Sequence, residues 1–297
     1  MGDKLKIICD GDSWVFGCEI VDPLIEKKYG GEGIHPGAYD FFPENDSYRI
    51  PRIFSTYLAK IMDAEVENLA WPADDNTTIL NRTVVHLSKE YLAKGLSTDN
   101  LLVIVGWSSP ERNSFWFKEG SASTRFRLWP NVQHFDFPLQ KKFWEIYVTS
   151  LWNREEYLPR YVMNVLQLQN FCDTHNIKWI CFNSFYQTPK ANSPKEWNDL
   201  EIKKELLDLK LNGSIHGYSS NTVEKNRRIQ NMYEYVSLWE TINPDRFYMK
   251  DQKNNTFKSF IEANNQDDAY CGWHPSPSSH EIWAEELYRY IKDKNLI

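Results

Sequence analysis

The sequence predicts an α/β protein built on a mainly parallel sheet. Two observations indicate this class: short apolar runs rich in β-branched residues recur along the chain, and stretches with helical spacing of apolar residues separate them. In addition, polar residues follow directly after several of the runs, and the carboxyl ends of parallel strands border the ligand crevice of such sheets. Strands are predicted at residues 4–9, 65–70, 100–105 and 177–182.

Helices are predicted between and after these strands. They span residues 51–62, 76–94, 143–174, 201–209 and 222–242, and a last one opens with a capping box at Ser278 and Glu281. We expect an interruption of the third helix near Pro159, because proline removes an amide donor, and a restart capped by Asn153.

Three segments depart from this alternation, and we expect them to be insertions in one domain of residues 1–297. Residues 26–47 are rich in glycine, proline and aromatic residues, which predicts a long loop. Residues 107–138 show no helical period and predict a hairpin with aromatic and basic faces. The third segment, 187–245, holds the two helices around 201–242 and a polar loop with His216.

Composition excludes several classes of function. A net charge of −7 in 297 residues argues against binding to a phosphate backbone, so no nucleic-acid partner is expected. Five scattered cysteines without CxxC spacing argue against disulfide staples and a zinc site. No run of about 18 apolar residues occurs and no signal region opens the chain, so we expect a cytoplasmic protein without a membrane partner. The oligomeric state is unknown from the sequence.

The first strand is followed at once by Gly-Asp-Ser at residues 11–13. One interpretation is structural, because Asp or Ser before a new helix is a common cap. The other is chemical, because a serine just past the first strand lies where ligands bind. A phosphate-binding loop is not indicated, since neither GxGxxG nor a terminal Lys-Ser or Lys-Thr occurs, and no cofactor is expected.

Four short blocks decide between these interpretations. Gly-Asp-Ser lies near the N-terminus, His-Pro at 274–275 precedes the last helix, an asparagine-containing turn spans 68–74, and residues 105–108 follow the third strand. This arrangement resembles the GDSL/SGNH hydrolase family of serine esterases and lipases, although the two middle blocks are degenerate. The resemblance implies a three-layer α/β/α sandwich with a flavodoxin-like sheet.

The resemblance also implies the chemistry of the site. Ser13 would be the nucleophile and His274 the general base that takes its proton, with His280 as a competing base for which a solvated or capping role is favoured. The oxyanion would be bound by the amide of Ser13, the amide of Ala73 at the family's glycine position, and the hydroxyl of Ser108 at the family's asparagine position.

The third member of the triad departs from the family. An aspartate usually stands three residues before the histidine, and here that position is Cys271. Asp267 or Asp268 could reach the histidine from a longer loop, or a backbone carbonyl could hold it in a Ser-His dyad. Cys271 as a nucleophile is a further alternative to an inert, buried thiol.

A tryptophan occurs in each block, namely Trp14, Trp71, Trp107 and Trp273. They predict an aromatic pocket suited to sugar faces or apolar chains, against the alternative that they only pack. Three hypotheses follow: a hydrolase cleaving carboxylic esters such as O-acetyl groups on a carbohydrate, with acyl transfer as a variant; a catalytically degraded protein that binds a glycan; and a structural or assembly protein.

Overall fold

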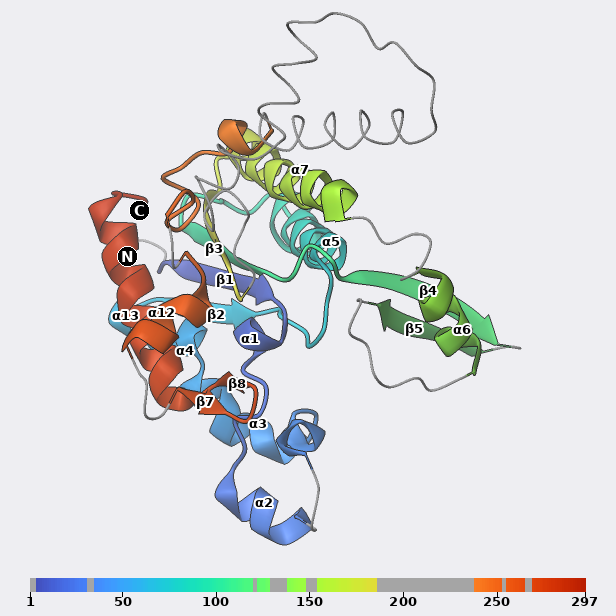
Figure 1. The fold of residues 1–297 in the computed structure, drawn as a ribbon. Coiled ribbons are helices and arrows are strands. Elements are labelled where there is room, and N and C mark those ends of the chain that lie inside the picture. Colours follow the sequence, from blue (N-terminus) through green and yellow to red (C-terminus); the bar gives the residue numbers. More distant parts are fainter. Residues whose placement is uncertain are drawn as a thin grey trace, which may run out of the picture.

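The computed structural model describes residues 4–30, 35–119, 122–128, 138–147, 154–185, 238–252, 255–264 and 269–297. Its centre is a four-stranded parallel sheet of order β2-β1-β3-β6 (Figure 1). The strands are β1 (Lys6–Gly11), β2 (Glu65–Asn68), β3 (Leu101–Trp107) and β6 (Lys178–Asn183). Phe247 and Thr256 form parallel bridges to β6 and occupy the fifth position of the sheet. This is the 2-1-3-4-5 order of a flavodoxin-like sheet, so the predicted fold class is confirmed.

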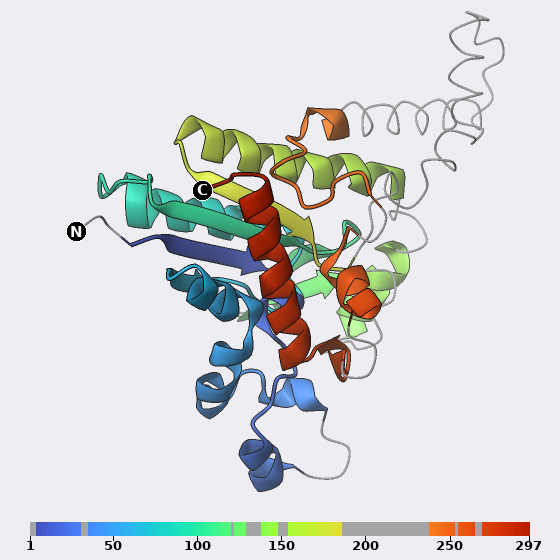
Figure 2. The same ribbon diagram turned by 90° about the vertical axis from the view of Figure 1, so that its left-hand side faces the viewer.

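Helices cover both faces of the sheet, which is why its central strands read as continuous apolar runs. α5 (Asn76–Leu87), the π-helical turn η3 (Ser88–Leu92) and α7 (Arg154–Thr174) lie on one face. α4 (Phe54–Ile61), α12 (Phe257–Asn264) and α13 (Pro277–Asp293) lie on the other. Figure 2 shows α13 crossing the strands.

Alternate residues of each strand feed two separate cores. Val103 and Val105 of β3 pack against α5 and α7, whereas Leu102 and Ile104 pack against α4 and α13. Every residue of β3 is buried, in keeping with its position between β1 and β6 in the sheet.

The prediction of a long loop at 26–47 is wrong. The segment after β1 contains α1 (Ser13–Phe16), α2 (Pro23–Tyr29), η1 (Pro36–Tyr39), α3 (Pro43–Arg49) and η2 (Ile50–Arg52). Pro36 and Pro43 stand at the first position of a helical turn, where the missing amide proton is not needed and the fixed φ suits the helix. Prolines interpreted as loop signals are therefore helix starts.

The hairpin predicted within 107–138 is present. β4 (Asn113–Glu119) pairs antiparallel with β5 (Ala122–Leu128), and the pair extends away from the sheet with α6 (Pro138–Ile146) beside it (Figure 1). Phe126 and Leu128 pack with Tyr147 and Tyr157 in a small separate core.

Two helix boundaries differ from expectation. Pro159 lies inside α7, so the helix continues through the proline at which an interruption was expected. α13 is capped by Ser276, two residues earlier than expected, because its hydroxyl accepts the Ser279 amide. Asn153 and residues 201–237 lie outside the described residues. Within the described part of the chain, no helix is long and apolar enough to cross a membrane.

Candidate active site

Ser13 opens α1 directly past the end of β1, at the carboxyl edge of the sheet. Asp12 caps this short helix by accepting the Trp14 amide at 3.0 Å. Gly106 of β3 makes room for the helix, because a Cβ there would lie 2.9 Å from Phe182 and closer still to Val15. The glycine therefore allows α1 to rest on the sheet. Ser13 is 6% exposed.

His274 lies in a small hairpin of β7 (Tyr270–Cys271) and β8 (His274–Pro275), which contacts α1. The ring centroids of His274 and Trp14 are 6.5 Å apart. The histidine and serine predicted from the sequence therefore come from adjoining elements. Among the described residues no hydrogen bond joins the Ser13 hydroxyl to the imidazole. Such contacts are often long without substrate and tighten when it binds.

Glu19 is the carboxylate that contacts His274, and sequence reasoning missed it. Its Oε1 lies 3.1 Å from Nδ1 of His274, and its Oε2 accepts the amide of Trp273 at 2.6 Å. Burial raises the pKa of Glu19, but the contacts with His274 and the Trp273 amide outweigh burial and hold the pKa below its ordinary value. The carboxylate is therefore charged beside the imidazole at neutral pH.

The segment around Glu19 fixes its position. Its backbone amide donates to Asp40 at 2.7 Å, and its φ of 65° is left-handed. Left-handed backbone in a residue other than glycine is costly and is found preferentially at functional sites. A second imidazole, His35, approaches the same Oε1 at 3.5 Å from the solvent side.

The predicted oxyanion donors have different surroundings. Ala73 has a φ of 60°, the left-handed conformation that favours glycine, although it carries a methyl group. Ser108 is buried, its backbone is clamped by the amide side chain of Asn76, and its hydroxyl accepts from Arg112 at 2.9 Å. The oxyanion role of these residues stays a prediction.

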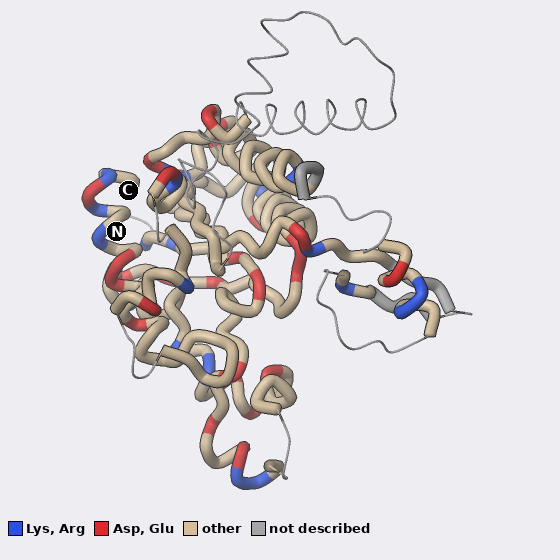
Figure 3. The backbone as a smooth tube through the Cα atoms, in the orientation of Figure 1, with Lys and Arg blue, Asp and Glu red and all other residues tan. Residues whose placement is uncertain are grey.

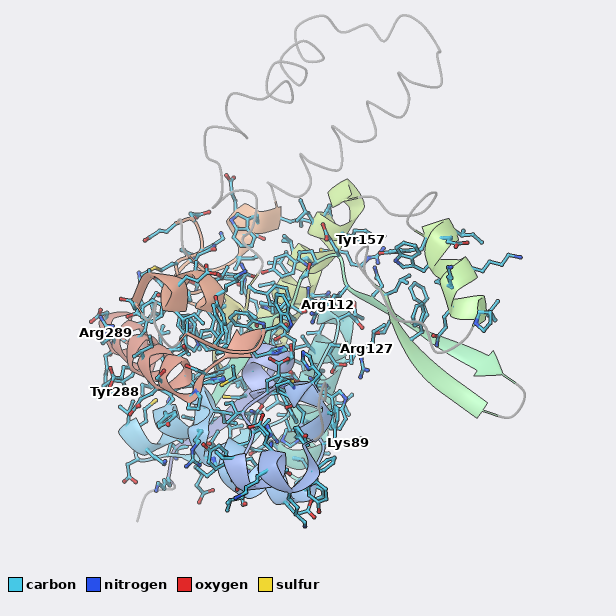
Figure 4. The ribbon with its side chains drawn as sticks, turned by 60° about the horizontal axis from the view of Figure 1, so that its bottom comes forward. Lys89, Arg112, Arg127, Tyr157, Tyr288 and Arg289 are labelled. Atoms are coloured by element: carbon cyan, nitrogen blue, oxygen red, sulfur yellow. The ribbon has the colours of Figure 1, made fainter. Side chains whose placement is uncertain are left out.

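Arg112 is a second residue that sequence reasoning missed. Its Nη1 lies 3.6 Å from Oδ2 of the fully buried Asp12. Burial raises the pKa of Asp12 despite the opposing effects of Arg112, the Trp14 amide and Ser108, and burial lowers the pKa of Arg112. Arg112 and Arg127 both come from the base of the β4–β5 hairpin, where it joins the body of the molecule (Figure 4). A cation thus stands directly behind the serine turn.

A second charged cluster braces the same edge. Arg82 of α5 binds Asp10 at the end of β1 and Asp74 in the loop after β2. Thr83 donates to Asp10 at 2.7 Å, and Arg127 lies 3.9 Å from Asp74. Figure 3 marks the positions of the acidic and basic residues along the chain. These pairs tie β1, α5 and the hairpin together around the loop that carries Ala73.

The four tryptophans do not line one pocket. Trp107 is fully buried against Tyr161 on the α5 and α7 face, whereas Trp14 is buried on the opposite face. A ring at the end of an apolar strand is simply drawn into the core. Trp71 and Trp273 are exposed, and Trp71 packs against Phe41, with centroids 5.3 Å apart.

His280 is not solvated as expected. It is fully buried, and its Nδ1 accepts the amide of Phe54 at 3.2 Å, which caps the start of α4. Burial lowers the pKa of His280 to about 3, so the ring is neutral. Cys271 is half-buried in β7, and Asp267 and Asp268 lie outside the described residues.

A surface hollow of about 400 Å³ lies elsewhere, between β1, β2, α5 and η3. It contains none of the predicted site residues, and its groups pair with one another, as in the 3.5 Å contact of His86 with Glu67. Within the described residues, no three His, Cys, Asp or Glu side chains are grouped to hold a metal ion.

The sheet order, the helices on both faces and the serine turn at the carboxyl edge define a flavodoxin-like α/β fold. The chain belongs to a family of unknown function (DUF6071), whose model matches residues 40–196. No curated protein matches the chain.

Several solved structures of esterases are similar to the chain. A protein assigned to the lipolytic G-D-S-L family from Desulfitobacterium hafniense is 10% identical, with 96% of this chain and 99% of that chain covered and a TM-score of 0.42. The esterase EstA from Pseudoalteromonas is 12% identical, with 97% of both chains covered and a TM-score of 0.41. A family two carbohydrate esterase from Clostridium thermocellum is 12% identical, with 98% of this chain and 65% of that chain covered and a TM-score of 0.44. Because the identities are this low, the chemistry of this chain is argued from its own residues alone.

Proposed function

We propose that this chain is a serine hydrolase that cleaves carboxylic esters, with Ser13 as nucleophile and His274 as general base. The observation that carries the proposal is the contact of the hairpin that holds His274 with the short helix that begins at Ser13. A hydroxyl becomes an effective nucleophile only when a neighbouring base takes its proton. A protein with a purely structural role has no physical need of this pairing.

The reaction has two halves. Ser13 Oγ attacks the ester carbonyl carbon while its proton passes to Nε2 of His274, and a tetrahedral oxyanion forms. Its collapse breaks the bond to the alcohol, which leaves with the proton from His274. Water then attacks the acyl-serine while His274 takes its proton. Collapse of the second tetrahedral intermediate breaks the bond to Ser13 Oγ, which receives that proton from His274, and the acid is released. Acyl transfer would differ only in that a second alcohol replaces water.

The backbone amides of Ser13 and Ala73 are the donors we propose for the oxyanion. The left-handed backbone of Ala73 lets this residue take the place of the family's glycine. Each donor of this kind typically contributes about 10²- to 10³-fold in rate. Ser108 would add a third donor, which requires its hydroxyl proton to point toward substrate while its oxygen accepts from Arg112.

The substrate we propose is an acyl ester of a carbohydrate. Trp71 and Phe41 are 45% and 55% exposed, and their tilted rings pack against each other and against Phe16, three residues after the nucleophile. Exposed aromatic rings suit the apolar faces of sugars. Trp71 lies two residues before Ala73, so this aromatic surface adjoins the proposed oxyanion site.

A second candidate function is glycan binding without catalysis. The nearly buried Ser13 and the missing hydrogen bond to His274 in the described residues favour it. The two functions share the aromatic surface and differ in whether the serine is activated.

A fluorophosphonate probe with mass spectrometry distinguishes them, because such a probe modifies a serine only when a base and oxyanion donors activate it. We expect an adduct on Ser13 that is absent in His274→Ala. His86→Ala is the matched control, since that imidazole contacts Glu67 in the separate hollow. A folded wild-type protein without any serine adduct would refute the hydrolase and favour glycan binding, measurable by titration with acetylated oligosaccharides.

A further inference from the structure

The segment after α1 supplies a carboxylate to the histidine. In the family that the sequence resembles, the orienting acid stands three residues before the histidine, and here that position is Cys271, which has no carboxylate. A general base of this kind needs a partner on Nδ1 that holds the ring and stabilises the imidazolium. In the structure, the group on Nδ1 is Glu19, which precedes the histidine by most of the chain.

We infer that Glu19 is the positioning residue of a Ser13-His274-Glu19 triad, in which the acid comes from the serine side of the site instead of the histidine loop. This inference rests on the proposed hydrolase function. The acid then differs from the family pattern both in residue type and in its place in the fold.

The geometry of the carboxylate fits this role. The 3.1 Å separation of Nδ1 and Oε1 favours a proton on Nδ1, and this tautomer leaves the Nε2 lone pair available to a serine proton. The other oxygen accepts the Trp273 amide, so one carboxylate holds both the imidazole and the backbone beside it. The Glu19 side chain is 2% exposed, so little water competes for these contacts.

The turn of the β7–β8 hairpin is shaped around the carboxylate. Gly272 has a φ of 60°, and a Cβ there would collide with Oε2 of Glu19. Only glycine therefore lets the turn close over the carboxylate. The left-handed backbone of Glu19 and its amide bond to Asp40 fix the position from the other side.

The other acidic groups that face His274 have different partners. Asp12 and Asp40 both act on it through their charge. However, Asp12 caps α1 and lies beside Arg112, and Asp40 binds the Glu19 amide. Among the carboxylates in the described part of the chain, Glu19 is therefore the group placed to orient the ring.

His35 provides an internal comparison. Its Nδ1 accepts the Gly37 amide at 3.1 Å, so its proton is on Nε2, which faces Oε1 of Glu19. Its side chain is 57% exposed and the distance is 3.5 Å, so water can replace this contact. His35→Ala removes a neighbour of Glu19 without removing the partner of His274.

The test is the second-order rate of Ser13 labelling by a fluorophosphonate in Glu19→Gln, Glu19→Asp, His35→Ala and the exposed control Glu26→Gln. Glu19→Gln removes the negative charge. Its side-chain amide has one acceptor oxygen where the carboxylate has two, so its NH₂ group must face either Nδ1 of His274 or the backbone amide of Trp273. We expect Glu19→Gln to slow labelling by about 10²- to 10⁴-fold, as loss of the triad carboxylate does elsewhere. Glu19→Asp should recover part of that loss, and the other two should stay within about threefold of wild type.

A second readout separates positioning from general damage to the fold. A proton held between Nδ1 and a carboxylate gives a strongly downfield ¹H NMR resonance, which we expect in wild type and in Ser13→Ala but not in Glu19→Gln. Wild-type labelling that needs His274 but is unchanged in Glu19→Gln would overturn the inference and leave the hydrolase standing. No labelling of the wild type would refute the hydrolase instead, and the resonance would then decide the contact independently.

Discussion

Gly106→Ala tests how the sheet carries the nucleophile. The new Cβ would lie 2.9 Å from Cζ of Phe182 and closer still to Cγ2 of Val15, whereas apolar carbons pack at about 3.5 to 4.0 Å. The neighbours must therefore retreat by more than about 0.6 Å at Phe182 and further at Val15. Both are buried and close-packed, so we expect a loss of about 2 to 3 kcal/mol, in the upper part of the range for overpacking.

Urea unfolding of a double-mutant cycle measures this effect. Val15→Ala removes the methyl group that the new Cβ meets and alone should cost about 1 to 3 kcal/mol. In the double variant the closer collision, with Val15, is relieved and the one with Phe182 remains. The losses of the two single variants should therefore sum to at least about 1 kcal/mol more than the loss measured for the double variant. Additive losses, within about 0.5 kcal/mol, would refute the idea that α1 rests on this glycine.

Two further predictions concern buried ionisable side chains. Arg112→Met leaves the carboxylate of Asp12 buried without its cation, so we expect the free energy of unfolding to fall by about 3 to 5 kcal/mol at pH 7. This loss should shrink at lower pH, because Asp12 then takes up a proton. A loss that is independent of pH would contradict this reasoning. His280 has a pKa of about 3 when folded against 6.5 ordinarily, so below pH 6.5 the unfolded chain binds a proton that the folded chain does not, and stability falls by up to about 1.4 kcal/mol per pH unit. His280→Asn keeps an acceptor for the Phe54 amide but has no group that titrates in this range. In urea unfolding between pH 7 and 4.5, the stability of this variant should therefore fall less steeply with decreasing pH than that of wild type. Equal slopes of stability against pH would count against a neutral buried ring.

The sheet could be predicted because its strands are buried on both faces. β3 is a continuous run of apolar residues, and only a layered α/β fold places such a run between two sets of helices. The serine after β1 and the histidine before α13 could be located because each adjoins a strong signal, a strand end in one case and a helix start in the other.

The acid could not be predicted, because its requirement is spatial. Any carboxylate that reaches Nδ1 can orient an imidazole, and Glu19 reaches it through a left-handed backbone and a glycine turn that no sequence spacing encodes. Arg112 was missed for a similar reason, since its pairing with Asp12 depends on where the hairpin leaves β3. Of the two roles favoured for His280, solvation is wrong because the ring is buried, whereas capping is what it does: its Nδ1 accepts the Phe54 amide at the start of α4.

The outer edge of the sheet has a consequence for association between molecules. An uncovered strand can template pairing with another chain, and proteins oppose this with short edge strands and charged side chains. β2 is only four residues long, and two of them are glutamates, of which Glu67 pairs with Lys6 on the neighbouring strand. A foreign strand added here would gain few backbone hydrogen bonds and would meet a row of negative charge. This edge is therefore protected against growth of the sheet from one molecule into the next.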